Sequence, residues 1–144
     1  MSITGITIIN GPNLNLLGKR EPEVYGKQSF EDYFSMLKEK FTDVPLSYFQ
    51  SNHEGELISK IQEIGFSRVG IVLNPAGYSH TSVALADAVA AVDAPVVEVH
   101  ISNIFSREEF RKHSYISPVS AGVLTGFGLA GYELALNFLM EHYG

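Results

Sequence analysis

A chain of 144 residues, 45% of them hydrophobic and 18% charged, is long enough to bury the core of one domain and too short for two. Its net charge of −6 offers no basic surplus for binding nucleic acid or an anionic membrane, and the absence of cysteine excludes disulfides, thiolate catalysis and thiolate metal sites. The sequence begins without a signal peptide and has no apolar run near the ~18 residues of a membrane span, so we expect a cytoplasmic protein.

The first predicted elements are a strand, a long loop and a helix. A β-rich run from Ile3 to Asn10 ends at Gly-Pro and predicts the strand. The polar loop from Gly11 to Gly26 has roughly 16 residues, a length that is usually functional or disordered in α/β proteins. Ser29 is expected to cap the helix that follows, with acidic residues in its first turn and lysines in its last. The residues at helical spacing that should face the core are Phe30, Phe34, Leu37 and Phe41.

Strands and helices alternate along the rest of the chain. The further predicted strands are residues 46–50, 69–73, 96–101 and 121–125. Asn52 is expected to cap a helix that ends at Gly65, and two more helices are expected over 82–92 and from about 129 to 141. Five strands alternating with helices predict an α/β fold with a doubly wound parallel sheet, a three-layer α/β/α sandwich. Ligands bind such sheets beyond the carboxyl ends of the strands.

Polar residues follow two of these predicted strand ends. In the loop after the first strand, Asn13 supplies an amide, Arg20 a fixed cation and Tyr25 a phenol that could act as a base if a neighbouring guanidinium favours its ionised form. A solvated loop in which these residues only pack is the alternative. After the third strand, a turn at Asn74 followed by a helix start accounts for every residue of the segment except His80. The backbone N–H groups of that helix start could bind an anion or a polar edge of a substrate.

The fourth predicted strand carries two polar residues that share a face. The strand period of two places Glu98 and His100 on the same side, and a carboxylate that orients and charges an imidazole makes a competent general acid. A solvent-facing edge strand with two polar residues is the alternative. Ser102 follows at the strand end, and Arg107 and Arg111 lie on the segment behind it.

Two further segments carry specific expectations. In the helix over 82–92, Asp87 is the only charged residue; a helix that is apolar all round must be covered on more than one side, so we expect an oligomer with Asp87 at the contact. The glycines of 126–131 match the spacing of a dinucleotide-binding motif, but the following strand and ribose-binding acid are missing. A tight turn with close helix packing is expected there instead.

These motifs together resemble the type II 3-dehydroquinate dehydratases over nearly the whole chain. The matching segments are Gly-Pro-Asn-Leu-Asn-Leu-Leu-Gly at 11–18, Arg-Glu-Pro at 20–22 with Tyr-Gly at 25–26, Gln-Ser-Asn-His-Glu-Gly at 50–55, Asn-Pro at 74–75 with His-Thr-Ser at 80–82, and Glu-Val-His-Ile-Ser-Asn at 98–103. One departure is the order Ala76-Gly77, where the family commonly has Gly-Ala after Asn-Pro.

The resemblance implies a flavodoxin-like fold, a single catalytic domain over 1–144 and a hydro-lyase. The implied reaction is the reversible dehydration of 3-dehydroquinate to 3-dehydroshikimate through an enolate, without a metal or organic cofactor. It belongs to the shikimate pathway of aromatic amino acid biosynthesis, or alternatively to quinate breakdown. Tyr25 would be the base, with Arg20 lowering its pKa, and Asn13 would hold the water that stabilises the enolate. His100, oriented by Glu98, would be the general acid.

The resemblance also implies a substrate site and an assembly. The substrate-binding residues would be Asn74, His80, Asp87, Ile101, Ser102 and Arg111. Asp87 would reach the site from a neighbouring subunit, in trimers that assemble into a dodecamer.

Two rival classes make different demands on the sequence. A Schiff-base dehydratase needs a desolvated lysine, but the lysines lie in loops or on polar helix faces: Lys19, Lys27, Lys38, Lys40, Lys60 and Lys112. A flavodoxin-like signalling module needs acidic residues at the end of the first strand, but no Asp or Glu precedes Glu21. A flavin-binding module needs a Ser/Thr-rich phosphate loop there, which Gly11-Pro12-Asn13 does not supply. The five histidines show no metal-ligand spacing.

Overall fold

A computed structural model describes residues 2–19, 23 and 27–144 and is built on a parallel sheet. The strands are β1 (Gly5–Asn10), β2 (Leu46–Gln50), β3 (Val69–Asn74), β4 (Val96–His100) and β5 (Gly122–Thr125), in the order β2-β1-β3-β4-β5. The long helices are α2 (Phe30–Lys40), α3 (Glu54–Ile64), α4 (Val83–Ala91) and α5 (Ala130–Tyr143). This strand order is that of the flavodoxin-like doubly wound sheets, and the predicted α/β/α sandwich is confirmed.

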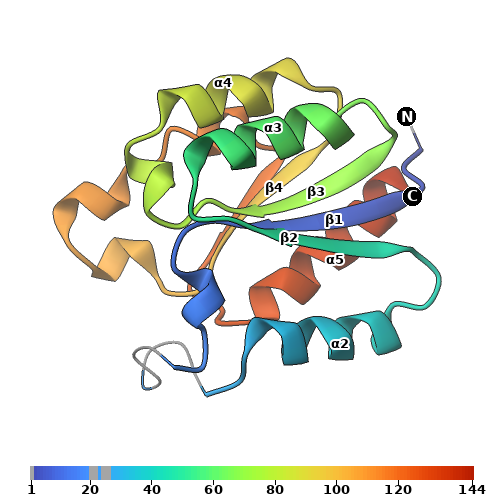
Figure 1. Cartoon of the computed structure of the whole chain (residues 1–144), viewed down its shortest axis with the longest axis horizontal. Helices are drawn as coiled ribbons and strands as arrows, with labels where there is room; N and C mark the ends of the chain where they lie inside the picture. Colours follow the sequence, from blue (N-terminus) through green and yellow to red (C-terminus); the bar gives the residue numbers. More distant parts are fainter. Residues whose placement is uncertain (1, 20–22, 24–26) are drawn as a thin grey trace.

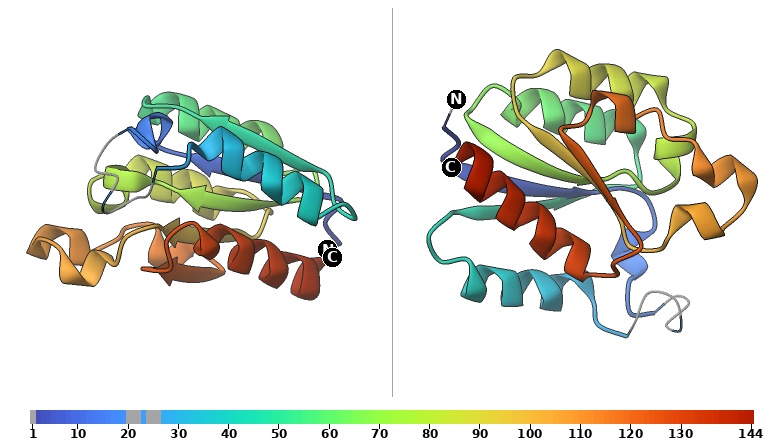
Figure 2. Two further views of the ribbon diagram at one scale, coloured as in Figure 1. Left: turned by 90° about the horizontal axis from the view of Figure 1, so that it is seen from below. Right: turned by 180° about the vertical axis from the view of Figure 1, so that it is seen from behind.

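The helices lie in two layers. α3 and α4 cover one face of the sheet, and α2 and α5 cover the other (Figure 1). Figure 2 shows the same layers from below and from behind, with the two ends of the chain close together. The N–H of Ile3 donates to the carbonyl of Tyr143 at 2.7 Å, which fixes the start of the sheet against the end of α5. No helix in the described part of the chain is long and apolar enough to cross a membrane.

Each face of the sheet supports its own hydrophobic core. Successive side chains of β3 alternate between the two: Val72 packs with α2 and α5, while Ile71 and Leu73 pack with α3 and α4, and all three are fully buried. A parallel strand covered on both faces is apolar throughout, as the sequence of this strand predicted.

The first long helix begins and packs as its sequence indicates. The hydroxyl of Ser29 accepts a hydrogen bond from the N–H of Asp32 at 3.2 Å, which confirms the predicted cap. Three of the expected core residues are buried and Phe34 is partly buried against the same core. Tyr33 is buried as well, which was not predicted. Its hydroxyl can be buried because it donates to the carbonyl of Leu129 at 2.7 Å.

The expected cap of α3 was wrong. His53, not Asn52, precedes the helix, and the Ser51 hydroxyl accepts the His53 N–H at 3.0 Å within the turn. The Asn52 side chain is therefore free for another partner, and its Oδ1 accepts the backbone N–H of Asn13 at 3.0 Å. This bond ties the loop after β1 to the loop after β2. Gly65 ends the helix as predicted.

The sheet order reverses between β1 and β3, so their carboxyl ends form the switch point at which such sheets bind ligands. A Cβ on Gly11 would lie 2.7 Å from the carbonyl oxygen of Pro75, so only glycine allows the two loops to approach this closely. Asn10 and Asn74 lie opposite one another in register. The buried Tyr132 hydroxyl bridges them, donating to Asn10 Oδ1 at 2.8 Å and accepting from Asn74 Nδ2 at 2.9 Å.

The segment after β5 makes the predicted tight turn. Gly126 and Gly128 both have positive φ, at 91° and 62°. Their N–H groups donate to the carbonyls of His100 and Ile101. Gly131 begins α5 so close to β4 that a Cβ there would lie 3.3 Å from Val99, which agrees with close helix packing.

α4 has one buried and one exposed side. The buried side consists of Leu85, Ala86, Ala88 and Val89, with the Ser82 hydroxyl capping the helix by accepting the Leu85 N–H at 2.9 Å. The exposed side is also apolar except for one carboxylate, and consists of Val83, Ala84, Asp87, Ala90 and Ala91.

The order Ala76-Gly77 strains the turn after β3 and provides a stability test. Ala76 has φ of 52°, in the left-handed region that costs an L-residue roughly 1–2 kcal/mol, whereas Gly77 lies outside that region with open space around it. Exchanging the two residues should raise the free energy of unfolding by about 1 kcal/mol, since glycine relieves the strain and alanine restricts the unfolded chain. Urea unfolding measures the difference, with Ala76→Gly and Gly77→Ala as single controls. A less stable Ala76→Gly would show that the turn carries no strain.

Candidate active site

A cavity of about 180 Å³ opens beyond the carboxyl ends of β1, β3 and β4, where the strand order predicts a ligand. It collects most of the residues that the sequence singled out in separate loops. The predicted site residues that line it are Asn13, Asn74, His80, His100, Ile101, Ser102 and Arg111.

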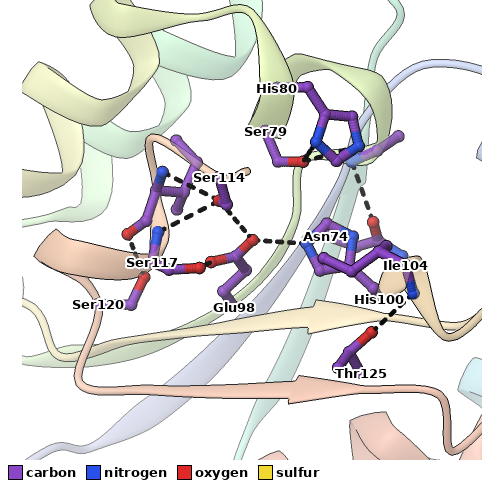
Figure 3. A network of polar contacts seen from close by, with 12 residues as sticks. Asn74, Ser79, His80, Glu98, His100, Ile104, Ser114, Ser117, Ser120 and Thr125 are labelled. Atoms are coloured by element: carbon purple, nitrogen blue, oxygen red, sulfur yellow. Dashed lines mark hydrogen bonds and ion pairs between the residues drawn. The ribbon is translucent and has the colours of Figure 1, made fainter. Parts of the chain in front are cut away.

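Glu98 and His100 form a buried pair at the end of β4. Because β4 lies between β3 and β5, the alternative of a solvent-facing edge strand is wrong. Glu98 is 0% exposed and His100 is 5% exposed. Their side chains share a face, as predicted, and Nε2 of the imidazole lies 2.5 Å from Oε2 of the carboxylate (Figure 3). His100 also lines the cavity, so Nδ1 is the ring nitrogen left for a ligand.

Two serines complete the environment of the carboxylate. Ser114 donates its hydroxyl to Oε2 of Glu98 at 2.8 Å, and Ser117 donates to Oε1 at 2.5 Å. Burial alone would raise the pKa of Glu98, but the hydrogen bond and charge of His100 and the two serine hydroxyls together hold it below its usual value. The carboxylate is therefore ionised at neutral pH and stabilises a positive charge on the imidazole. Sequence reasoning missed both serines, because they lie far along the chain in an irregular segment with no local signal.

His80, unlike His100, is held as a neutral imidazole. Its Nδ1 lies 2.8 Å from the carbonyl oxygen of His113, which can only accept, so Nδ1 carries the proton and Nε2 is the acceptor. Burial lowers the pKa of His80, and the neighbouring His100 and Arg111 lower it further despite the opposing hydrogen bond to His113. The rings of His80 and His100 lie 6.3 Å apart and nearly parallel. The cavity thus contains one neutral imidazole beside one that a carboxylate can charge.

The Asn74 amide is oriented by groups below the cavity. Its Nδ2 donates to the Tyr132 hydroxyl, and its Oδ1 accepts the N–H of Ala76 at 3.0 Å. These two bonds leave one N–H of the amide for a ligand. Tyr132 is fully buried, and burial raises its pKa, so its hydroxyl keeps its proton and the network is fixed.

Two arginines give one wall of the cavity a positive charge. Arg107, which sequence reasoning noted only as lying behind the strand, lines the cavity and donates Nη1 to the Ser102 hydroxyl at 3.3 Å. Arg111 also lines it, with its guanidinium carbon 4.9 Å from the centre of the Phe110 ring and Nε 3.2 Å from Glu108. A carboxylate-bearing ligand fits this wall even though the whole chain is acidic.

Apart from Glu98, three of the predicted residues are not among the described residues that line this cavity. Arg20 and Tyr25 lie outside the described residues. Asp87 lies on the exposed side of α4 and does not line the cavity of its own chain. Asn13 is at the cavity with φ of 71°, a left-handed conformation that asparagine tolerates. Within the part of the chain that is described, no three histidine, aspartate or glutamate side chains are grouped so as to hold a metal ion.

Comparisons with known proteins show the family to which the chain belongs. The family model described as dehydroquinase class II matches residues 4–140. The 3-dehydroquinate dehydratase of Polynucleobacter asymbioticus is 58% identical over 134 residues, which cover 91% of this chain and 90% of that protein. The crystal structure of type II dehydroquinase from Butyrivibrio crossotus has a TM-score of 0.90 at 46% identity, covering 95% of this chain and 97% of that one. The corresponding structure from Propionibacterium acnes gives 0.92 at 40% identity, covering 98% and 99%. With the cavity at the switch point and the Glu98–His100 pair at its base, the chain belongs to the class II dehydroquinases, a family of hydro-lyases.

Proposed function

We propose that this chain, as a single catalytic domain over residues 1–144, converts 3-dehydroquinate reversibly into 3-dehydroshikimate and water. The observation that carries the proposal is the buried Glu98–His100 pair, which faces a cavity with two arginines on its wall. Loss of water from a hydroxy ketone needs a base for the carbon-bound proton and an acid for the departing hydroxyl. The Glu98–His100 pair is the proposed acid. Membership in the class II dehydroquinases supports the choice of 3-dehydroquinate as the substrate.

The first step is proton removal from C2 of the substrate. Tyr25 takes this proton as the phenolate, and the C–H electron pair moves onto the ketone to form an enolate. Arg20 favours the ionised phenol and stabilises the developing charge. Asn13 holds the water that donates to the enolate oxygen. The roles of Arg20 and Tyr25 rest on the motif at 20–26, since both residues lie outside the described part of the chain.

The second step is loss of the hydroxyl group. The enolate returns its electron pair to the carbon skeleton, the C–O bond breaks and His100 gives a proton to the leaving oxygen, so that water departs. The ionised Glu98 favours the charged imidazole before transfer and holds Nε2, which leaves Nδ1–H as the donor. His80 stays neutral and accepts a substrate hydroxyl at Nε2.

Substrate recognition uses the ends of β3 and β4. Asn74, His80 and Arg111 bind substrate hydroxyl groups and the carboxylate, together with the backbone N–H groups of Ile101 and Ser102. The positive wall of the cavity supports this assignment, because it provides charge-assisted hydrogen bonds for a small anion.

The site is completed by a neighbouring subunit. The exposed apolar side of α4 is suited to cover by a second copy of the chain, which would carry its Asp87 into the first copy's cavity. We propose trimers of this kind within a cytoplasmic dodecamer. The enzyme then serves the shikimate pathway of aromatic amino acid biosynthesis; quinate breakdown would use the same reaction and the same residues.

The central test is the formation of an enone from 3-dehydroquinate, followed by ultraviolet absorbance with no added metal. Tyr25→Phe should lower kcat by at least ~100-fold, in the range of a lost general base, with little change in KM. Tyr143→Phe, at the far end of α5, is the matched control and should retain wild-type kcat. Near wild-type activity in Tyr25→Phe would assign the base to another residue.

Borohydride separates this mechanism from one that uses a lysine. Incubation with borohydride and substrate should leave activity unchanged, because the enolate route forms no imine. Activity is assayed after removal of the reagents, with enzyme exposed to borohydride alone as the control. Loss of activity only when substrate is present, with a matching mass increase on a lysine, would establish a Schiff base instead.

The shared site is tested by complementation between inactive variants. Asp87→Asn and Tyr25→Phe should each be inactive, but their co-expressed mixed oligomers should regain part of the activity, since an intact Tyr25 then meets an intact Asp87 across the contact. Light scattering should give a mass near twelve times the 15.8 kDa of one chain. A monomer, or mixed oligomers without activity, would place Asp87 outside the site.

A further inference from the structure

Residues 113–117 follow the 3-10 turn η4 (Glu109–Lys112) and lead into the 3-10 turn η5 (Ser117–Val119). This segment bonds directly to His80 and to Glu98, the partner of His100. The His113 carbonyl accepts the proton of His80 Nδ1. Two residues further on, the Tyr115 N–H donates to the carbonyl of Ser79 at 2.8 Å. Ser114 and Ser117 donate to Glu98 (Figure 3). This segment, 113–117, therefore lies behind both imidazoles.

The two serines differ in what else they hold. Ser114 is buried, shares Oε2 of Glu98 with His100, and also accepts the backbone N–H groups of Ile116 and Ser117 at 3.1 and 3.2 Å. The Ser117 hydroxyl contacts Oε1 of Glu98, and among the described residues it is the one donor to that oxygen. Ser117 is only half-buried, so its hydroxyl can be removed without opening a cavity in the core.

We propose that Ser117, assisted by Ser114, is a positioning residue that keeps the negative charge on Glu98 and thereby keeps the transferable proton on His100. The inference rests on the proposed function, in which His100 is the general acid. A buried carboxylate next to an imidazole has two neutral arrangements of one proton: carboxylate with imidazolium, or carboxylic acid with imidazole. Only the first offers an N–H to the substrate from His100. Hydroxyl donors to the carboxylate favour the ionised partner and so select the first arrangement.

Removing the Ser117 donor has a defined sign. When the pair has lost its shared proton, it consists of carboxylate and neutral imidazole and carries a net negative charge. The serine donors stabilise this form more than they stabilise either protonated arrangement of the pair, which has no net charge. Without Ser117 that form is destabilised most, so the pair holds its proton to higher pH. Because the proton belongs to the pair, this shift is measured as one apparent pKa for Glu98 and His100 together.

The other groups near the pair stay unchanged in such a variant. On the sheet, Glu98 lies beside Leu73 of β3 and Val123 of β5, which do not titrate. The cavity side contributes His80, Arg107 and Arg111. The only charged residue of α4 is Asp87, which is exposed.

The chain offers a matched control for this experiment. Ser120 lies one turn further along the chain and is half-buried like Ser117, and its hydroxyl donates to the carbonyl of Ile116 at 2.8 Å rather than to Glu98. Ser120→Ala therefore removes a hydroxyl from the same turn without changing the carboxylate. Ser117→Thr keeps the hydroxyl and serves as the conservative rescue.

The test measures the pair with and without turnover. NMR titration of the His100 ring in substrate-free protein and the basic limb of the kcat–pH profile should both move up by about 0.5–1 pH unit in Ser117→Ala. This is less than the full effect of one hydrogen bond to a charged group, because the ionised carboxylate is present both before and after the pair loses its proton. We expect kcat at neutral pH to fall about threefold to tenfold with KM unchanged, because the imidazolium is a smaller fraction of the pair and a weaker acid. Ser120→Ala and Ser117→Thr should match the wild type in both measurements.

An unmoved or lowered His100 titration in Ser117→Ala would overturn the inference. Should that variant not fold, Ser114→Ala removes the donor to Oε2 and is expected to move the titration in the same direction. The two proposals fail separately. A wild-type protein that does not dehydrate 3-dehydroquinate refutes the function, whereas an active wild type with an unmoved titration in the variant refutes only the role of Ser117.

Discussion

The ionised carboxylate of Glu98 sets the strictest requirement in this structure. A charged carboxylate with no exposed surface is costly to bury unless each oxygen has hydrogen-bond donors of good geometry. Those donors come from the imidazole two residues away on the same strand and from two serines beyond the cavity wall. The strand, the cavity and the irregular segment after η4 must therefore be assembled together. If the segment left Glu98, the buried carboxylate would lose two of its donors, and this is why an irregular stretch of chain can hold Glu98 and His100 in place.

The same requirement divides the labour between two adjacent imidazoles. His80 and His100 are nearly parallel and only 6.3 Å apart, so two positive charges there would repel one another. Their partners resolve this conflict: a carbonyl oxygen fixes a proton on Nδ1 of His80, and a carboxylate stabilises a charge on His100. One residue can then accept a hydrogen bond while its neighbour donates a proton. The hydrogen-bond partners behind the two rings therefore determine which imidazole accepts a hydrogen bond and which one can donate a proton.

Much of the fold and part of the site could be predicted from local sequence. The period of two in β4 placed Glu98 and His100 on one face, and the cap of α2 followed from a serine and its neighbours. Sequence alone left open whether β4 is a buried strand or a solvent-facing edge strand, because the answer depends on which strands lie on either side of it in the sheet. Ser114 and Ser117 gave no signal, since only the folded chain brings them to Glu98 from 16 and 19 residues away. Asn52 misled because a cap and a loop-to-loop contact require the same side-chain oxygen, and here the contact with Asn13 is formed.

Because Gly11 has no side chain, the loop after β1 lies directly against the loop after β3. The N–H of Gly11 donates to the carbonyl of Asn74 at 2.8 Å, and the Asn13 N–H is held by Asn52. The loops after β1 and β3 are thus joined through their backbones, and the loop after β2 is joined to them by the Asn52 side chain, which does not line the cavity. The spacing of the three loops therefore does not depend on the side chains that project into the cavity. In the wall after β4, by contrast, the side chains themselves bond to one another: Arg107 donates to Ser102, and Arg111 donates to Glu108. New ligand specificity is therefore accessible by substitution along the second wall, while the first wall behaves as a rigid frame against which any new ligand must fit.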